Sequence, residues 1–339
     1  MSRLFRECAH FIKERVRRVG ITASRFYLQH IPIDSGKRKA WNSWIRPKLS
    51  WVVLDFDVKT VFGSRIRGNT KDLIQRYIYY FGVWEPHLTR WISGALAEGD
   101  GFIDIGANIG YYSLLAVSLV GPSGCVTAIE ASPTIFGHLK ENLRLNGASQ
   151  VRTENIAVAA HSGRVPIYRA SGDNEGRTTT IAEEAQSEDG FVLECEVEAA
   201  PLVALLSDDE VCKARIIKID VEGAEFSVAE GMASLLPRLR KGAEIVLEVS
   251  PERLQRQGKS VEDLLKIFYD AGYFAYGLVN DYSERDYLPP QEVIHPKRIR
   301  HGIDAQTDVI FSRFDAEELT RRCTECRAGV SLRQSAGSR

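Results

Sequence analysis

The sequence contains no apolar run of the roughly 18–20 residues that cross a lipid bilayer. Glu7, Lys13 and Glu14 also interrupt the apolar stretch that a signal peptide would need close to the N-terminus. Cysteine is scarce, with six residues scattered over 339 positions, so we expect reduced thiols and no disulfide framework. These absences together predict a protein of the cytoplasm.

Cys323 and Cys326 are the one pair of cysteines that lie close together in the chain, within a charged C-terminal segment. A structural zinc ion takes four ligands, and no second pair lies near this one. We therefore predict no zinc site there.

The formal net charge of −1 gives no general attraction to nucleic acid, and we expect no nucleic-acid partner. Residues 1–50 nevertheless contain twelve Lys and Arg against three acidic residues, a local net charge of +9. Within residues 1–30, apolar side chains fall at helical spacing: Leu4, Cys8, Phe11, Ile12, Val16 and Val19. Such a helix either packs on the rest of the protein or on a second subunit, which we favour, or lies as a peripheral anchor on the inner face of a membrane.

Residues 101–280 alternate short apolar runs with helical segments, which predicts a parallel sheet joined by crossover helices. With one later strand, seven strands are expected: Phe102–Gly106, Cys125–Glu130, Val151–Val158, Arg215–Asp220, Ile245–Val249, Tyr273–Leu278 and Asp308–Ser312. Helices are expected at Tyr111–Val120, Pro133–Asn146, Phe226–Leu236 and Val261–Ala271. Two extra strands, Val165–Tyr168 and Val192–Val197, flank a polar loop, Ser171–Gly190, which is either a lid or disordered.

The fold class is thus α/β, with a central, mostly parallel seven-stranded sheet and helices on both faces. The expected organisation is a basic N-terminal extension (1–50), a hairpin and helices that pack on the core (51–100), the main domain (101–313), and a C-terminal helix with a polar tail (314–339).

The most informative stretch is Asp104-Ile-Gly106-Ala-Asn108-Ile-Gly110, a turn between an apolar strand and a helix. A glycine-containing turn lets a ligand lie against the backbone, and the helix N-terminus offers free N–H groups. A dinucleotide fingerprint has the spacing G-x-G-x-x-G, whereas here an acid lies inside the motif and would repel a pyrophosphate. The pattern favours a cationic cofactor without phosphates, whose ammonium group Asp104 would bind.

Glu130 ends the second expected strand, twenty residues after that turn, where a carboxylate can accept both hydroxyls of a ribose. A third motif, Lys218-Ile-Asp220-Val-Glu222-Gly-Ala-Glu225, ends a buried strand at the edge of the sheet where ligands bind. We expect Asp220 to face the cofactor or the acceptor. Glu225 is expected to cap the following helix, and Glu222 is open to either role.

Together with Asn155-Ile-Ala157-Val, these motifs resemble the FkbM family of S-adenosylmethionine-dependent methyltransferases, over about residues 85–280. The resemblance implies a Rossmann-like class I methyltransferase fold and methylation of a hydroxyl group on a sugar, a glycan or a secondary metabolite. It also implies which residues bind the cofactor: Asp104, Gly106, Asn108 and Gly110 at the methionine end, Glu130 at the ribose, and Asn155 or Ala157 at the adenine. Thr178-Thr-Thr180 resembles a Ser-rich element that the family often has.

A hydroxyl acceptor must lose a proton, which calls for a base within hydrogen-bond reach or a metal that lowers the pKa of the hydroxyl. Asp220 is the first candidate base and Glu248, at the end of the next strand, is the second. The two could together hold Mg²⁺, but we favour a site without a metal. His295 and His301 are spare candidates, in a loop (281–306) expected over the same edge of the sheet. The competing hypothesis is a catalytically inactive binding or regulatory module of the same fold.

Overall fold

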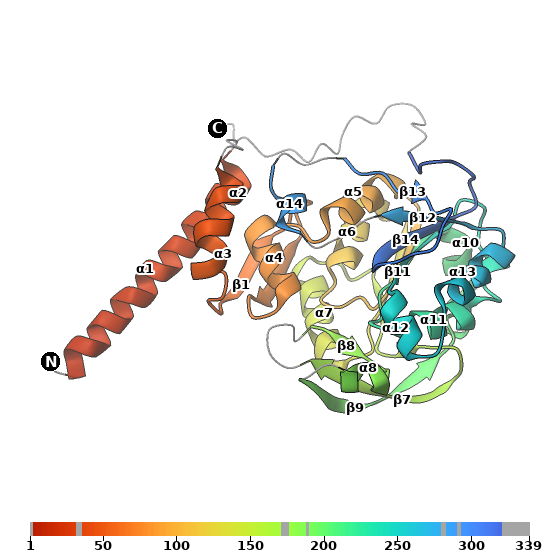
Figure 1. The fold of residues 1–339 in the computed structure, drawn as a ribbon, viewed down its shortest axis with the longest axis horizontal. Coiled ribbons are helices and arrows are strands. Elements are labelled where there is room, and N and C mark those ends of the chain that lie inside the picture. The colour runs from red at the N-terminus through yellow and green to blue at the C-terminus, as the bar shows by residue number, and fades with distance from the viewer. Residues whose placement is uncertain are drawn as a thin grey trace.

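The computed structural model describes residues 3–31, 36–170, 176–187, 190–278, 283–289 and 293–320, with the side chains of all but residues 3–14 and 187. Its central sheet is built from β3 (Gly101–Ile105), β4 (Cys125–Ile129), β5 (Arg152–Glu154), β10 (Ala214–Ile219), β11 (Glu244–Val249), β12 (Phe274–Leu278), β13 (Lys297–Arg298) and β14 (Thr307–Ser312). The strand order is β13-β12-β14-β11-β10-β3-β4-β5 (Figure 1). The five strands from β11 to β5 are parallel, and β14 runs antiparallel between β11 and β12.

The expected α/β sheet is confirmed, and β13 adds two residues at its edge as an eighth strand. The run expected as one strand over Val151–Val158 is divided. Its first part is β5, whereas Ala157–Val158 forms β6 in a second, smaller sheet.

Side chains of the central strands alternate between two apolar clusters, one on each face of the sheet. In β3, for example, Phe102 belongs to one cluster and Ile103 to the other. The first face is covered by α5 (Pro86–Ala95), α6 (Tyr111–Val120) and α7 (Pro133–Leu145). The second face is covered by α9 (Leu202–Leu205), α10 (Asp208–Lys213), α11 (Glu225–Met232), η2 (Leu236–Arg238), α12 (Pro251–Arg256) and α13 (Val261–Asp270).

The small sheet has the order β6-β9-β7-β8, from β6 (Ala157–Val158), β7 (Gly163–Ala170), β8 (Thr178–Thr179) and β9 (Phe191–Ala200). Both extra strands expected from the sequence are therefore present, as β7 and β9. A short helix, α8 (Ala182–Ser187), follows β8 and lies beside α12 (Figure 1). The small sheet thus reaches the edge of the main sheet where the parallel strands end.

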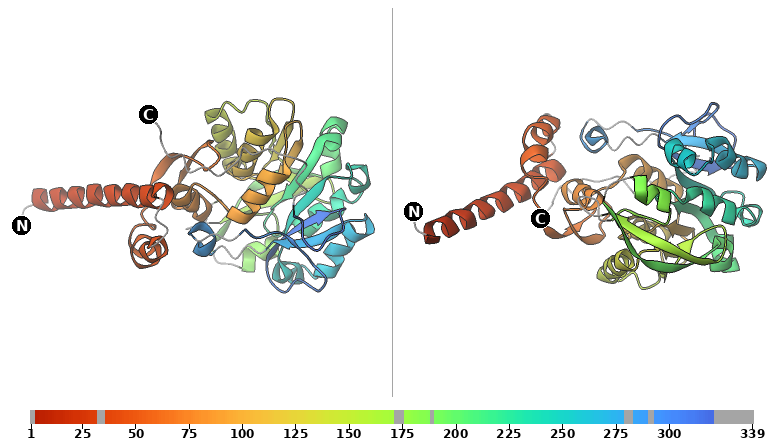
Figure 2. Two further views of the ribbon diagram at one scale, coloured as in Figure 1. Left: turned by 90° about the horizontal axis from the view of Figure 1, so that it is seen from above. Right: turned by 60° about the horizontal axis from the view of Figure 1, so that its bottom comes forward.

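The N-terminal part begins with α1 (Arg3–His30), which extends away from the rest of the protein in all three ribbon views (Figures 1 and 2). Next come α2 (Lys37–Ala40), η1 (Trp41–Ile45), α3 (Arg46–Lys48), the hairpin of β1 (Asp55–Lys59) and β2 (Arg65–Asn69), and α4 (Leu73–Phe81). Within the described ranges, no helix has the length and hydropathy needed to cross a bilayer.

The C-terminal helix expected within 314–339 falls largely on residues 321–339, which lie outside the described residues, as do Cys323 and Cys326. Residues 314–320 contain no helix, and Glu318 instead forms a single β-bridge with Lys297. Between β12 and β14 the described chain forms one short helix, α14 (Glu284–Tyr287).

Candidate functional site

Two cavities lie at the carboxyl ends of the central strands, where ligands bind in open parallel sheets. The larger holds about 650 Å³ of empty space, part of it open to solvent, and is walled by the ends of β3, β4 and β10 and by the small sheet. The smaller holds about 190 Å³ and is walled by residues of β10, β11 and β14. Asp220, directly after β10, lines both cavities.

The turn after β3 depends on residues that tolerate a positive φ. Gly106 has φ +77° and Gly110 has φ +90°, and Asn108 between them has φ +51°, a region that Asn enters more readily than most residues. A β-carbon on Gly106 would lie 1.7 Å from the backbone oxygen of Asp220. Glycine at position 106 therefore allows the first turn to touch the end of β10, which brings two of the sequence motifs together.

Asp104 is 1% exposed and lies behind this turn, outside the wall of either cavity. The Ser113 hydroxyl donates to its Oδ2 at 2.6 Å, whereas its Oδ1 is buried without a hydrogen-bond partner. Burial raises the pKa of Asp104, an effect that the neighbouring Lys218 ammonium opposes. A buried carboxylate oxygen with no donor is rare in folded proteins, which marks Asp104 as a candidate functional residue.

Glu130 lines the larger cavity and is 4% exposed. Its Oε2 accepts from the Asn108 N–H and its Oε1 from the Ser132 N–H, both at 2.9 Å. Burial raises the pKa of Glu130 to about 7, although these two hydrogen bonds oppose the shift. Each carboxylate oxygen retains a further lone pair, so the group can still accept two hydroxyls.

Asn155 and Ala157, both expected near the adenine, lie differently with respect to the larger cavity. Ala157 lines the larger cavity. Asn155 does not line it; its side-chain amide donates to the backbone oxygens of Glu130 at 2.8 Å and Ala131 at 3.0 Å. Asn155 therefore fixes the backbone that follows β4.

The polar loop expected over Ser171–Gly190 is described only in part, because residues 171–175 and 188–189 lie outside the described ranges. Its described part contributes Gly176 and Thr178–Thr180 to the wall of the larger cavity. The Asn108 amide also donates to the Gly176 oxygen at 3.2 Å. This geometry favours the lid interpretation of the loop.

A row of polar side chains crosses the first face of the sheet near the strand ends. Lys218 and Asp104 are paired in register between β10 and β3, and Glu248 and Asp308 between β11 and β14. All four alternate with strand residues of the same apolar cluster, so they point to the same face. No role was predicted for Lys218 from the sequence. A signal was present, because Lys218 and Asp220 are polar residues two positions apart at the end of an apolar strand and therefore share one face of the sheet.

Lys218 is the cation at the centre of this row. Its Nζ lies 2.9 Å from Asp220 Oδ2 and 4.8 Å from the centre of the Tyr112 ring. Burial alone would lower the pKa of Lys218, but the carboxylates of Asp220, Asp104 and Glu85 outweigh burial and raise it. Lys218 therefore stays charged and forms an ion pair with Asp220.

The smaller cavity is lined by three further carboxyl groups, those of Glu85, Glu248 and Asp308. Burial, reinforced by Asp308, raises the pKa of Glu85 to about 8, and the Tyr112 hydroxyl donates to Glu85. Glu85 precedes α5 and lies more than 200 residues from Asp308 in the chain. No local pattern connects the two, and they were missed in the sequence for that reason.

Glu248, the second candidate base, has both oxygens engaged. Arg253 donates to its Oε2 at 2.9 Å and Gln306 donates to its Oε1 at 2.5 Å. Burial raises the pKa of Glu248 well above its usual range, and the charges of Asp220 and Glu222 add to this effect.

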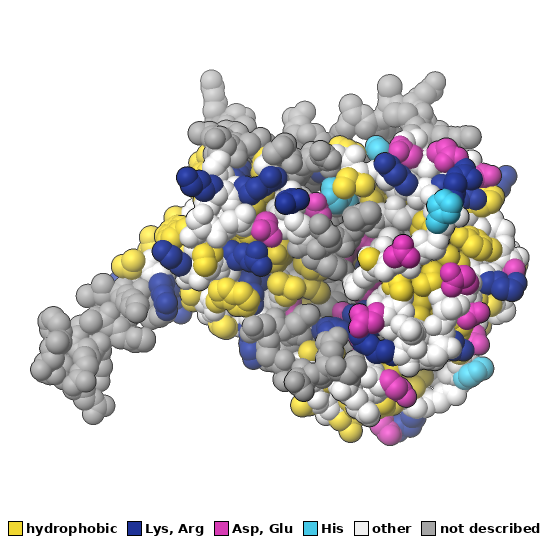
Figure 3. Space-filling view, in the orientation of Figure 1, with side chains coloured by type: hydrophobic (Ala, Val, Ile, Leu, Met, Phe, Trp, Pro, Cys, Tyr) yellow, Lys and Arg dark blue, Asp and Glu magenta, His cyan; other side chains and the backbone are white. Residues whose placement is uncertain are grey.

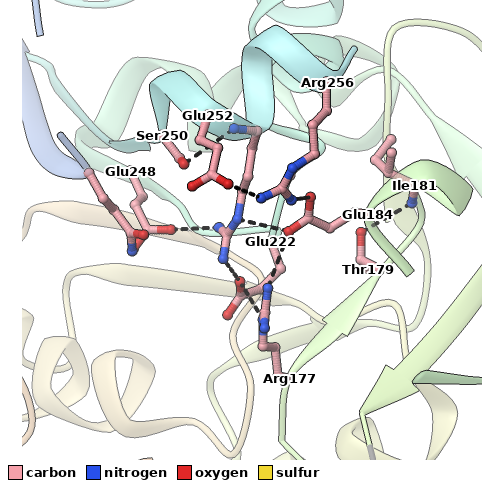
Figure 4. Close-up of polar contacts among 12 residues, drawn as sticks. Arg177, Thr179, Ile181, Glu184, Glu222, Glu248, Ser250, Glu252 and Arg256 are labelled. Carbon is pink, nitrogen blue, oxygen red and sulfur yellow. Dashed lines mark hydrogen bonds and ion pairs between the residues drawn. The ribbon is translucent and has the colours of Figure 1, made fainter. Parts of the chain in front are cut away.

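Arg253 belongs to a network of ion pairs that joins α12 to the lid (Figure 4). It lies 2.6 Å from Glu222 and 3.2 Å from Glu184 of α8. From the lid side, Arg177 lies 3.1 Å from Glu222 and 3.2 Å from Glu184. The positions of the lid and of the strand ends are thus coupled through shared carboxylates.

Glu225, at the start of α11, accepts from the Gly223 N–H with both carboxylate oxygens, at 3.0 and 2.9 Å. Gly223 lies before the helix, so these hydrogen bonds are not the helix cap expected from the sequence, although Glu225 is the acidic residue of the first helical turn. Neither His295 nor His301 lines a cavity. Across the described ranges, no three His, Cys, Asp or Glu side chains are grouped as metal ligands.

Comparison with known proteins identifies the family. The sequence model of the methyltransferase FkbM domain matches residues 104–275, just over half of the chain. This match contains the turn after β3, Glu130, Asp220 and Glu248. No curated protein matches the chain significantly in sequence.

Several solved methyltransferase structures are similar at low sequence identity. The SAM-dependent O-methyltransferase from Thermotoga maritima is 14% identical, with 78% of this chain and 79% of that chain covered and a TM-score of 0.37. The M. jannaschii protein TYW2 in complex with AdoMet is 14% identical, with 77% and 87% covered and a TM-score of 0.38. The precorrin-6y C5,15-methyltransferase from Geobacter metallireducens is 16% identical, with 66% and 86% covered and a TM-score of 0.36.

The large, mostly parallel sheet with helices on both faces agrees with the Rossmann-like class I methyltransferase fold expected from the sequence. With the family match across the motifs that build the larger cavity, the chain belongs to the FkbM family of methyltransferases.

Proposed function

We propose that the protein transfers a methyl group from S-adenosylmethionine to a hydroxyl group of a sugar, a glycan or a secondary metabolite. The observation that carries the proposal is the position of Asp220, on the wall of both cavities at the end of β10. In this proposal the larger cavity binds the cofactor and the smaller one receives the acceptor hydroxyl, so that Asp220 lies between them.

The residues around the larger cavity fit the proposed cofactor. This cavity opens to solvent and is lined by the turn after β3, by Glu130 after β4 and by apolar side chains of the small sheet. The remaining lone pairs of Glu130 would accept the ribose hydroxyls. Asp104 lies behind the turn that lines this cavity, and from there its carboxyl group would attract the ammonium group of the methionine end. When bound, the cofactor supplies the electrophilic methyl group of a sulfonium.

The acceptor hydroxyl needs a base, and Asp220 suits this role better than Glu248. Asp220 forms an ion pair with Lys218 at 2.9 Å, and its side chain is 35% exposed. Both oxygens of Glu248 already accept hydrogen bonds, from Arg253 and from Gln306. Burial also raises the pKa of Glu248, which favours its protonated form, and a protonated carboxyl group cannot accept the hydroxyl proton. The Asp220 carboxylate would take the hydroxyl proton as the acceptor oxygen forms its bond to the methyl carbon.

The smaller cavity also supports a hydroxyl-rich acceptor. The carboxyl groups of Glu85 and Asp308 on its wall can form hydrogen bonds with the hydroxyls of a polyol. In-line methyl transfer depends on alignment and on removal of water, and fixed acceptors on the wall supply both.

The first test concerns the cofactor. Titration calorimetry should detect S-adenosylmethionine binding to the wild-type protein, and Asp104→Ala should weaken binding tenfold or more, because the ammonium group then loses its charged partner. Unchanged affinity in this variant would contradict the assignment of the larger cavity.

The second test concerns transfer, measured as radiolabel moved from methyl-labelled cofactor to a panel of sugars and polyols. Asp220→Asn should keep its cofactor affinity and lower turnover by roughly 10²–10⁴, the usual contribution of a general base. Full activity in Asp220→Asn with an inactive Glu248→Gln would instead assign the base to Glu248. A protein that retains the cofactor and methylates no acceptor would be the inactive binding module.

A further inference from the structure

The long helix α1 packs on the rest of the protein through one side of its C-terminal half. Ile21, Ser24 and Leu28 are buried on this side. Arg25 and Gln29 donate to the backbone oxygen of Tyr79, at the end of α4, at 2.9 and 3.3 Å. The orientation of the helix is therefore fixed, and its other side faces away from the protein.

The outward side carries an apolar stripe. Val16 is 65% exposed, Val19 is 69% exposed and Phe26 is 56% exposed. Positions 16, 19 and 26, with the exposed Ala23, are spaced by three and four residues and so lie along one line of the helix surface. At about 100° per residue, this line lies roughly 150° around the helix from the buried side.

Trp44 of η1 lies next to the stripe. It is 47% exposed, and a β-carbon on Gly20 of α1 would lie 3.9 Å from its indole ring. Tryptophan is enriched where proteins meet the boundary between lipid and water. Of the two kinds of packing favoured from the sequence, packing of this stripe on the rest of the protein is wrong for Val16 and Val19, because both face solvent. Packing on a second subunit stays a prediction.

The charge around the stripe selects between a membrane and a second copy of the chain. Residues 15–31 contain four arginines and no acidic residue, and Arg15, Arg17 and Arg18 are exposed. Yellow apolar and dark-blue basic side chains lie side by side on this part of the surface (Figure 3). Two copies that paired along their stripes would bring these arginines together, whereas an anionic surface complements them.

We infer that the outward stripe of α1, formed by Val16, Val19 and Phe26 with Trp44 beside it, docks the protein on the surface of a bilayer that contains anionic lipid. The apolar side chains enter the boundary between headgroups and acyl chains, and the flanking arginines bind the lipid phosphates. Basic residues near such a surface act nearly additively, so three arginines strengthen binding to anionic vesicles roughly a hundredfold over neutral ones. The inference does not depend on the proposed methyl transfer.

The experiment is vesicle flotation of the full-length protein at low salt. Wild-type protein should float with vesicles of equal parts phosphatidylcholine and phosphatidylglycerol, should lose this binding at high salt, and should stay unbound with phosphatidylcholine alone. Val16→Asp/Val19→Asp should abolish flotation while the far-ultraviolet circular dichroism is unchanged. The matched control is Val192→Asp/Leu193→Asp on β9, at positions that are 52% and 60% exposed, and it should float like the wild type.

Three results would overturn the inference. In the first, wild-type protein does not float with the mixed vesicles. In the second, Val16→Asp/Val19→Asp floats as well as the wild type. In the third, light scattering shows a wild-type dimer that Val16→Asp/Val19→Asp converts to a monomer, without vesicle binding by either. The stripe would then be an interface between two copies of the chain.

Discussion

The carboxyl group of Glu130 couples the stability of the fold to pH in a direction opposite to that of most acidic residues. Its pKa is about 7 in the folded protein against an ordinary value of 4.5, because the group is buried. The folded state therefore holds the proton that the unfolded chain releases, and the stability gained from this proton is lost as pH rises from 4.5 to 7. At about 1.4 kcal/mol per pH unit, the loss is about 3 kcal/mol.

The test is Glu130→Gln, which keeps the shape of the side chain and removes its titration. Gln presents one oxygen where Glu presents two, so the variant loses one acceptor for the N–H groups of Asn108 and Ser132, at roughly 1 kcal/mol. This loss is nearly independent of pH. The difference in unfolding free energy between pH 5 and pH 8 should therefore change by about 3 kcal/mol between wild type and variant, as measured by urea denaturation.

The same group gives a signature in cofactor binding if it accepts the ribose hydroxyls as a carboxylate. With a pKa of about 7, Glu130 is mostly protonated at pH 6 and mostly ionised at pH 8, so affinity for S-adenosylmethionine should fall about tenfold between pH 8 and pH 6. Glu130→Gln is the control: any pH dependence of affinity that remains in this variant comes from other groups, including the cofactor itself. Equal pH dependence of stability and of affinity in the two proteins would refute the reasoning.

Two further predictions concern the turn after β3 and the network around Arg253. Gly106→Ala should destabilise the protein by at least about 2 kcal/mol in a thermal-melt assay and weaken cofactor binding, because the new β-carbon would overlap the Asp220 backbone. The control is Gly137→Ala in α7, where the space around the glycine is open; this variant should be neutral or stabilising in the same assay. Arg253→Met should cost about 3–5 kcal/mol at pH 8, because three carboxylates lose a shared cation. The cost should be smaller at pH 5.5, because burial raises the pKa of Glu222 and of Glu248 and both can then be protonated. Urea unfolding at both pH values measures this, with Arg238→Met at an exposed ion pair as the control; equal losses at both pH values would contradict it.

The main sheet was predictable because its signals are local. Buried parallel strands are short apolar runs, and glycines and caps end the elements between them. α6 has the expected bounds, Tyr111–Val120, and most other strands and helices of the sheet agree within one or two residues. Two expectations differ more. The helix expected over Phe226–Leu236 ends at Met232, and the run Val151–Val158 is shared by two different sheets. No local pattern states where a strand leaves one sheet for another.

The cofactor side of the candidate site was predictable in the same way. The turn after β3 needs residues that tolerate a positive φ, and Gly106 and Gly110 provide them. A carboxylate follows the end of β4. Both features depend on residues that are close together in the sequence. Asn155 shows the limit of this reasoning: the motif was visible, but the direction of its amide, toward the Glu130 and Ala131 oxygens, depends on the backbone that it faces.

The sequence by itself determined the α/β sheet, the family and the turn that lines the larger cavity, because each rests on spacing within a few residues. Three other features depend on the tertiary structure alone. They are the set of carboxyl groups around Lys218, the hydrogen bonds that Arg253 and Gln306 donate to Glu248, and the side of α1 that faces outward. These features arise where strand order and helix packing bring together segments as distant as Glu85 and Asp308. Such contacts depend on which elements become neighbours in space, and the spacing of residues along the chain does not predict which distant elements pack together.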